Sequence, residues 1–153
     1  LFYVAICLIQ FSLMMLLGIH LMPYLGLPAL HLGGSIAAVF VVALMLSFAA
    51  TSLGVLIGTI FSSYQQASIF GTVIDVIMAA VGGIMVPLFA MPEPIKFIGR
   101  LTPLNWGMES FNDLFLRGYG IIEVLPEEMK LRIFSIIILL LAWKANKNNV
   151  IAQ

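Results

Sequence analysis

The feature that most constrains this chain is the placement of its charges, because no Asp, Glu, Lys or Arg occurs before Asp75. Over the whole chain only 9% of the residues are charged, whereas 62% are hydrophobic. Soluble domains usually carry about 25% charged residues. Together with a mean hydropathy of +1.13, this distribution predicts a membrane protein.

Apolar runs long enough to cross a bilayer recur along the chain. A helix needs about 20 mostly apolar residues to cross the hydrocarbon core, and we predict spans at about 1–22, 36–61, 67–88 and 126–146. A loop rich in Pro and Gly over 23–35 and a tight polar turn over 62–66 separate the first three. The predicted fold class is an all-α polytopic membrane protein with about four transmembrane helices in a single domain, residues 1–153.

The ends of the chain bear on its orientation. The last span is predicted to begin at Pro126, with Glu127 and Glu128 in a first turn where the helix dipole favours acids. Lys144, in the last turn of the span, and Lys147, just after it, favour the cytoplasmic side. We expect a multi-pass protein of the cell (cytoplasmic) membrane with both ends in the cytoplasm. The chain starts at Leu1 inside an apolar run, so we also expect a fragment whose N-terminal part is missing.

The second span carries a stripe of small residues that includes Gly54 and Gly58 in the sequence GVLIG. In lipid, close backbone approach at small residues is a main cause of helix packing. This face is therefore predicted to meet another helix, either within the chain or in a second subunit.

Asp75 lies in the third span, where a carboxylate costs roughly 2.5 to 3.5 kcal/mol on insertion scales. Such a group lines a transport path or a proton-linked site, or else it is satisfied locally, for example by a hydrogen bond to Thr72. Both interpretations stay open.

Further along the same span, Gly82 and Gly83 weaken the helix, and Pro87 removes a backbone donor and clashes with the preceding turn. We predict a kink or break there. Irregular backbone at membrane depth is tolerated only where it is buried in protein or lines a cavity, so these three residues are candidates for a gate.

Two short amphipathic helices are predicted before the last span, at about 92–101 and 103–117. Thr102 can cap the second helix, with Pro103 at its first position. Asp113 and Arg117 can pair at i, i+4, and Gly118 suits the end of the helix. Neither segment is long enough to span, so we expect both to lie at the membrane surface or to dip back into it.

Several functions lack any motif in this sequence. It has no Gly-rich phosphate loop, no nucleophile and base at useful spacing, and no basic or aromatic patch suited to nucleic acid. His20 lies just before the Pro/Gly loop and His31 lies within it, and their spacing does not form a ligand motif for a metal. We therefore expect no enzyme activity and no cofactor in this chain.

Two stretches carry a resemblance to a known family: SLGVLIGTIFSSYQQAS, and GGIMVPLFAMPEPIKFIGRLTPLNWGMESFNDLFLRG before a last span. They resemble the C-terminal half of type-2 ATP-binding-cassette (ABC) exporter permeases. The resembling motif includes Arg100, Thr102, Pro103, Asn105 and Trp106, and its second helix ends at Arg117. It implies spans three to six of a six-span permease, with the paired helices on the outside.

The resemblance also implies partners: a second permease subunit, as a homodimer or heterodimer, and separate ATPase subunits that hold ATP and magnesium at the cytoplasmic face. The predicted function is therefore ATP-driven export across the cytoplasmic membrane. The alternative is a non-transporting membrane scaffold or immunity-type protein that associates through GVLIG. Apolar spans suit a lipid-like or amphipathic cargo, and a sugar polymer or a peptide stays open as well.

Overall fold

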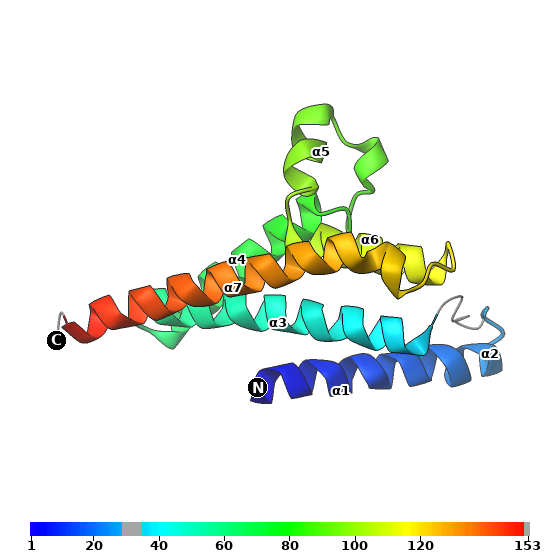
Figure 1. The fold of residues 1–153 in the computed structure, drawn as a ribbon, viewed down its shortest axis with the longest axis horizontal. Coiled ribbons are helices and arrows are strands. Elements are labelled where there is room, and N and C mark those ends of the chain that lie inside the picture. Colours follow the sequence, from blue (N-terminus) through cyan, green and yellow to red (C-terminus); the bar gives the residue numbers. More distant parts are fainter. Residues whose placement is uncertain (29–34, 152–153) are drawn as a thin grey trace.

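The computed structural model describes residues 1–28 and 35–151, and every regular element in that part of the chain is a helix. Figure 1 shows long helices side by side, with a smaller helical unit projecting from one flank. The chain passes along the bundle in alternating directions, as the predicted polytopic fold class requires. The part of the predicted loop 23–35 that holds His31 lies outside the described residues.

The first helix is α1 (Phe2–Leu16), which continues through a π-helical turn, η1 (Leu17–Leu21), into α2 (Met22–Tyr24). The three form one helical stretch of 23 residues. It ends two residues later than the predicted span, and Gly26, with φ +72°, follows it. That φ favours glycine, because a Cβ is strained there.

The central helix is α3 (Ile36–Ile60), which contacts α1, α4, α6 and α7. Most of its buried side chains are small, among them Ala38, Val39 and Val42. They form the core with Met15, Leu114 and Val124, which come from α1, α6 and α7. Because small side chains let helix axes approach closely, α3 can contact helices on several sides.

The turn between α3 and α4 (Tyr64–Val81) is shorter than the predicted one over 62–66, since Tyr64 is already helical. Ser63 is the N-cap, and its side chain accepts a hydrogen bond from the Gln66 backbone N–H at 3.3 Å. Phe61 and Phe70 stack across the turn with ring centroids 4.5 Å apart. Capping by Ser63 thus starts the helix three residues earlier than the predicted span.

The far end of α4 differs more from the predicted span, which ran to Leu88. The helix ends at Val81, and Gly82 is its C-cap. Gly83 follows with φ +94°, a conformation that any other residue would adopt only with strain. The predicted interruption is therefore present, as the end of the helix and not as a kink within a longer one.

The projecting unit contains a 3₁₀ turn, η2 (Leu88–Ala90), and α5 (Glu93–Gly99). It leads into α6 (Pro103–Phe115), which packs against α3 and α7. Asn105, Ser110 and Asp113 of α6 are buried, so part of its polar face points into the protein. Both short helices were predicted; α5 is one residue shorter at its start and two at its end, and α6 is two residues shorter at its end. That they lie at the membrane surface or dip back into it stays a prediction.

The last helix is α7 (Ile121–Ile151), and the prediction that it begins at Pro126 is wrong. The Glu123 carboxylate accepts a hydrogen bond from the Gly120 backbone N–H at 2.9 Å. This is half of a capping box, and it starts the helix five residues earlier. Pro126 lies inside the helix, where its missing N–H leaves one carbonyl of the first turn without its usual helical partner.

Three helical stretches of the described chain are long and apolar enough to cross a membrane: Phe2–Tyr24, Ile36–Ile60 and Tyr64–Val81. The last helix is not among them. Its apolar run is preceded by Glu127, Glu128 and Arg132 and followed by Lys144 and Lys147. That α7 also crosses the membrane stays a prediction.

Candidate functional site

A groove of about 690 Å³ runs between α3 and α4. Its walls are formed mainly by small side chains and glycines, and Pro103 and Leu104 of α6 line it as well. The predicted residues Gly54, Gly58 and Asp75 all line this groove. The fold therefore brings together three residues that lie on two different predicted spans.

Gly54 and Gly58 face open space, since a Cβ added to either would meet no atom within 4 Å. At these two glycines the face therefore contacts no other helix of the described chain. That it contacts a second subunit stays a prediction. The adjacent helix α4 is equally uncovered, with no buried residue along its length.

Asp75 is exposed on α4. No hydrogen bond or ion pair joins it to any residue in the described part of the chain. The predicted local alternative does not form, because the Thr72 hydroxyl donates to the Ser68 carbonyl at 2.9 Å instead. The carboxylate thus remains available to water or to a group outside this chain.

The end of α4 is packed tightly against the start of α6. A Cβ on Gly82 would lie 2.9 Å from the Thr102 hydroxyl and 3.3 Å from Cβ of Leu104. A Cβ on Gly83 would lie 3.3 Å from Cγ of Leu88. The two glycines therefore do more than end the helix, because they let α6 and the following loop approach its last turn.

Hydrogen bonds fix this contact. The Asn105 side-chain amide, on a residue only 4% exposed, donates to the Gly82 carbonyl at 3.3 Å. Thr102 accepts from the Asn105 backbone N–H at 3.3 Å, which confirms its predicted role as the N-cap of α6. We refer to Gly82, Gly83, Thr102 and Asn105 as the α4–α6 joint.

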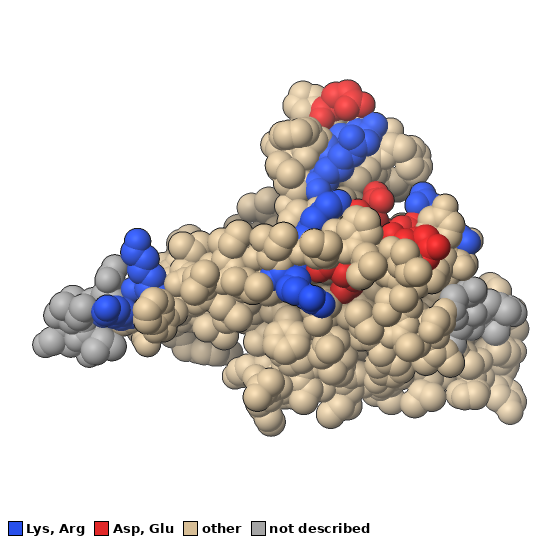
Figure 2. Space-filling view, viewed as in Figure 1, with Lys and Arg blue, Asp and Glu red and all other residues tan. Residues whose placement is uncertain are grey.

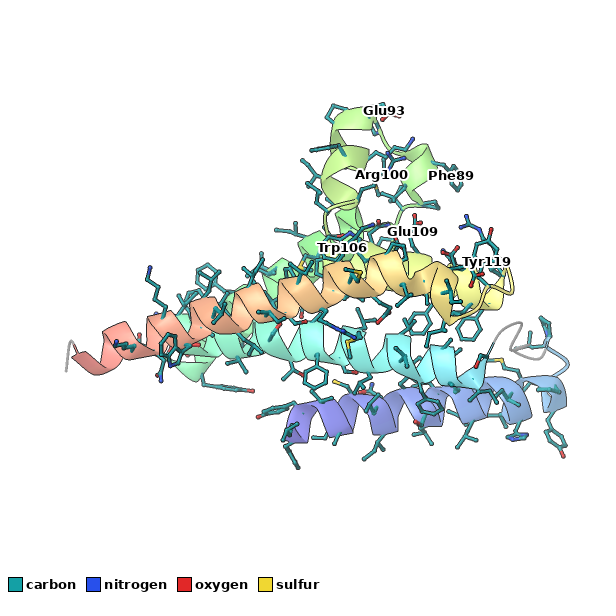
Figure 3. All side chains as sticks on the ribbon, in the orientation of Figure 1. Phe89, Glu93, Arg100, Trp106, Glu109 and Tyr119 are labelled. Carbon is teal, nitrogen blue, oxygen red and sulfur yellow. The ribbon has the colours of Figure 1, made fainter. Side chains whose placement is uncertain are left out.

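Trp106 extends the joint to two more helices. Its indole N–H donates to the Arg100 carbonyl at 2.7 Å, and its ring meets Phe134 of α7 edge-on with centroids 6.2 Å apart. In Figure 3, Trp106 lies where α6 passes α7, while Phe89 and Glu93 lie out on the projecting unit. The motif from Arg100 to Trp106 thus connects α4, α5, α6 and α7.

The remaining predicted residues lie away from the joint. Arg117 pairs with Asp113 near the far end of α6, as predicted. Gly118 follows with φ +65°, in agreement with its predicted place at the helix end. Pro87 lies in extended backbone before η2, and the Arg100 side chain is exposed.

Charges collect on one part of the molecule. In Figure 2 the acidic and basic side chains gather over α5, α6 and the start of α7, and a second basic patch lies near the end of α7. The body between them is almost free of charge on this face. An uncharged band between two charged ends is the pattern expected where a bilayer surrounds the helices.

Comparison with known proteins decides the family. The model of a family described as "ABC-2 family transporter protein" matches residues 1–144. The chain belongs to the ABC-2 transporter family. No curated protein and no solved structure matches it. The chain is therefore a type-2 ABC transporter permease, a multi-pass membrane component and not itself a catalytic one, as the resemblance of its motifs implied.

Sequence reasoning missed two further glycines at close contacts in the permease. A Cβ on Gly99 would lie 2.2 Å from the Val81 carbonyl oxygen, and one on Gly107 would lie 2.8 Å from Leu46. Gly99 brings α5 against the end of α4, and Gly107 brings α6 against α3. No local pattern marks such contacts, because each depends on a residue distant in sequence.

From the sequence, Glu128 is expected only as an acid in the first turn of the last helix, and its burial is not predicted. Its side chain is buried, and neither carboxylate oxygen has a hydrogen-bond partner. Its spacing from the buried residues Val124 and Leu131 was the available signal, since positions i, i+4 and i+7 share one face of a helix.

Proposed function

We propose that this permease works in an ABC exporter, in which ATP hydrolysis by partner subunits moves a cargo across the cytoplasmic membrane. The observation that carries the proposal is the α4–α6 joint beside the end of the α3–α4 groove. A gate needs an element that closes a path and can move as a unit, and α6 with its attached α5 meets that description.

The path in this proposal follows the α3–α4 groove. Its lining is mostly apolar and small, and Asp75 is a carboxylate there without a partner in the described chain. Intramembrane carboxylates commonly mark transport pathways. A lipid-like or amphipathic cargo suits such a surface, with its polar part near Asp75.

A second permease subunit completes the path. The uncovered faces of α3 and α4 support this proposal, because Gly54 and Gly58 offer a surface for close helix packing. Two subunits placed groove to groove enclose a cavity, whereas a single groove is open on one side.

The ATPase subunits are proposed to dock at the cytoplasmic face and to hold the ATP and magnesium. In the proposed orientation this face carries the turn between α3 and α4 and the end of α7, with Lys144 and Lys147. The joint and the projecting α5 then lie outside the cell. In this proposal, closure of the ATPase pair reorients the helices. The α4–α6 joint then opens or closes the outer end of the path.

The gate is tested by replacing Gly82 and Gly83 together with leucine in the full-length protein. The added side chains collide with Thr102 and Leu104, so α6 can no longer seat on the end of α4. Cells that express the natural protein are expected to accumulate less of at least one compound from a panel of amphipathic dyes. The double variant is expected to lose that difference.

Ala5→Leu is the matched control, because it adds similar bulk on the exposed side of α1. Both variants should insert normally, as judged by protection of a C-terminal tag from protease added outside the cell. Unchanged efflux by the double variant at normal insertion would contradict the gating proposal.

A further inference from the structure

The most unusual polar group in the described chain is the carboxylate of Glu128 on α7. The residue is 3% exposed, and neither Oε1 nor Oε2 has a hydrogen-bond partner. The great majority of buried polar side-chain atoms in proteins have at least one partner. The two oxygens of Glu128 therefore call for a physical explanation.

Its position on α7 fixes what surrounds it. Val124 and Leu131 lie one turn to either side on the same helix face, and both are fully buried. Val124 belongs to the core cluster with Val42 of α3 and Leu114 of α6. Glu128 thus lies on the face with which α7 packs against α3 and α6.

The neighbouring helices offer it no free cation. Over its whole length α3 has no charged residue. The charged residues of α6 are Glu109 and Asp113, both acidic, and Asp113 pairs with Arg117 beyond the end of the helix. Nothing on these two helices neutralises a negative charge at Glu128.

The charged residues of α7 do not pair with it either. Glu127 pairs with Lys130 at 2.8 Å. Arg132 lies one turn beyond Glu128, but it is exposed and makes no hydrogen bond with the carboxylate. Since the chain itself covers Glu128, a cation from another subunit cannot reach the carboxylate unless α6 or α3 first moves.

We propose that Glu128 is a proton-binding site that holds α7 against α6 and α3. An unpaired ionised carboxylate is far more costly to bury than a neutral carboxylic acid, so the packed state keeps the proton at pH values at which an exposed glutamate has lost it. Release of that proton to bulk water leaves a bare charge between Val124 and Leu131 and loosens the helix contact. This inference does not depend on the cargo or on ATP-driven export.

Infrared difference spectroscopy on the full-length protein in lipid nanodiscs tests the site directly. The carbonyl stretch of a protonated carboxyl is separate from the bands of a carboxylate, and labelling of glutamate with ¹³C assigns the band to this residue type. We expect a protonated glutamate band at pH 7 that disappears at alkaline pH. Glu128→Gln should remove the band, and the control Glu127→Gln, its ion-paired neighbour, should retain it.

Thermal unfolding in the same nanodiscs tests the consequence. The unfolded chain loses the Glu128 proton in the ordinary range of a glutamate, whereas the packed protein keeps it to higher pH. Stability should therefore fall as the pH rises across that interval and level off once the packed protein has lost the proton too. The melting temperature of Glu128→Gln should lose this part of the pH dependence, whereas Glu127→Gln should keep it.

Two results overturn the proposal. One is the absence of a protonated glutamate band at pH 7 in the natural protein, which means that Glu128 is ionised, for instance through Arg132. The other is a band that persists in Glu128→Gln. If Glu128→Gln does not fold, the titration of the ¹³C-labelled natural protein still decides, because absence of a protonated glutamate there refutes the site.

Discussion

Replacing Gly99 with alanine is expected to separate α5 from the end of α4. The added Cβ would lie 2.2 Å from the Val81 carbonyl oxygen and 2.8 Å from Cδ2 of Leu88, whereas ordinary contacts begin at 3.4 Å. The first overlap is therefore 3.4 − 2.2 = 1.2 Å. A backbone carbonyl cannot rotate away as a side chain can, so α5 has to shift by about that distance.

The cost follows from the overlap. Overpacking of this kind costs about 1 to 3 kcal/mol, and contact with backbone favours the upper end. Alanine recovers part of that cost, because it is better than glycine in a helix by up to about 1 kcal/mol. A net loss of about 2 kcal/mol lowers the ratio of folded to unfolded protein roughly 30-fold.

Thermal unfolding of the full-length protein in detergent measures this loss, and Gly71→Ala is the matched control. There the added Cβ lies 3.9 Å from the Ile57 side chain, an ordinary contact. Gly71→Ala should therefore be as stable as the natural protein or slightly more stable. If Gly99→Ala unfolds at the same temperature as Gly71→Ala, the packing of α5 on α4 described above is wrong.

Two further substitutions probe the same account. Thr102→Ala removes the N-cap of α6 and should cost about 1 kcal/mol, while Thr102→Ser keeps a capping hydroxyl and should cost much less; a thermal-unfolding series compares them. Gly58→Leu fills the open face of α3 and should reduce chemical cross-linking between two differently tagged permease copies, whereas Ile60→Leu, on an exposed position of the same helix, should leave cross-linking unchanged. Equal cross-linking by both would exclude that face from the subunit contact.

Helix existence could be predicted from this sequence because its causes are local. Apolar runs of sufficient length, the Thr102 cap and the Gly82–Gly83 interruption all act within a few residues. The predicted third span nevertheless runs to Leu88, because hydrophobicity continues past the glycines although the helix ends before them. Apolar composition thus predicts burial in lipid better than it predicts helix ends.

The start of α7 was missed for a related reason. Pro126 followed by two acids matches a helix start, but the carboxylate of Glu123 caps the helix at Gly120. Two competing start signals lay close together, and packing of Val124 in the core favours the earlier one.

The candidate site could be predicted only in its parts. The sequence marks Asp75, Gly54 and Gly58 as separate site candidates. The groove that they share depends on how α3 and α4 pack. Gly99 carries no local signature, and the spacing of Glu128 from Val124 and Leu131 indicates burial only once the core face of α7 is known, because both roles come from contacts with distant residues. Tertiary contacts therefore supplied both the α4–α6 joint and the buried carboxylate.

The central proposal is that this permease is the membrane component of an ATP-driven exporter. Purification of the tagged full-length protein in mild detergent tests it most directly, with identification of the co-purifying proteins and measurement of ATP hydrolysis. The account predicts an ATPase with a phosphate-binding loop in the purified complex and vanadate-sensitive hydrolysis of ATP. Recovery of the protein alone, or only with further copies of itself, would contradict the exporter and favour a scaffold that associates through Gly54 and Gly58.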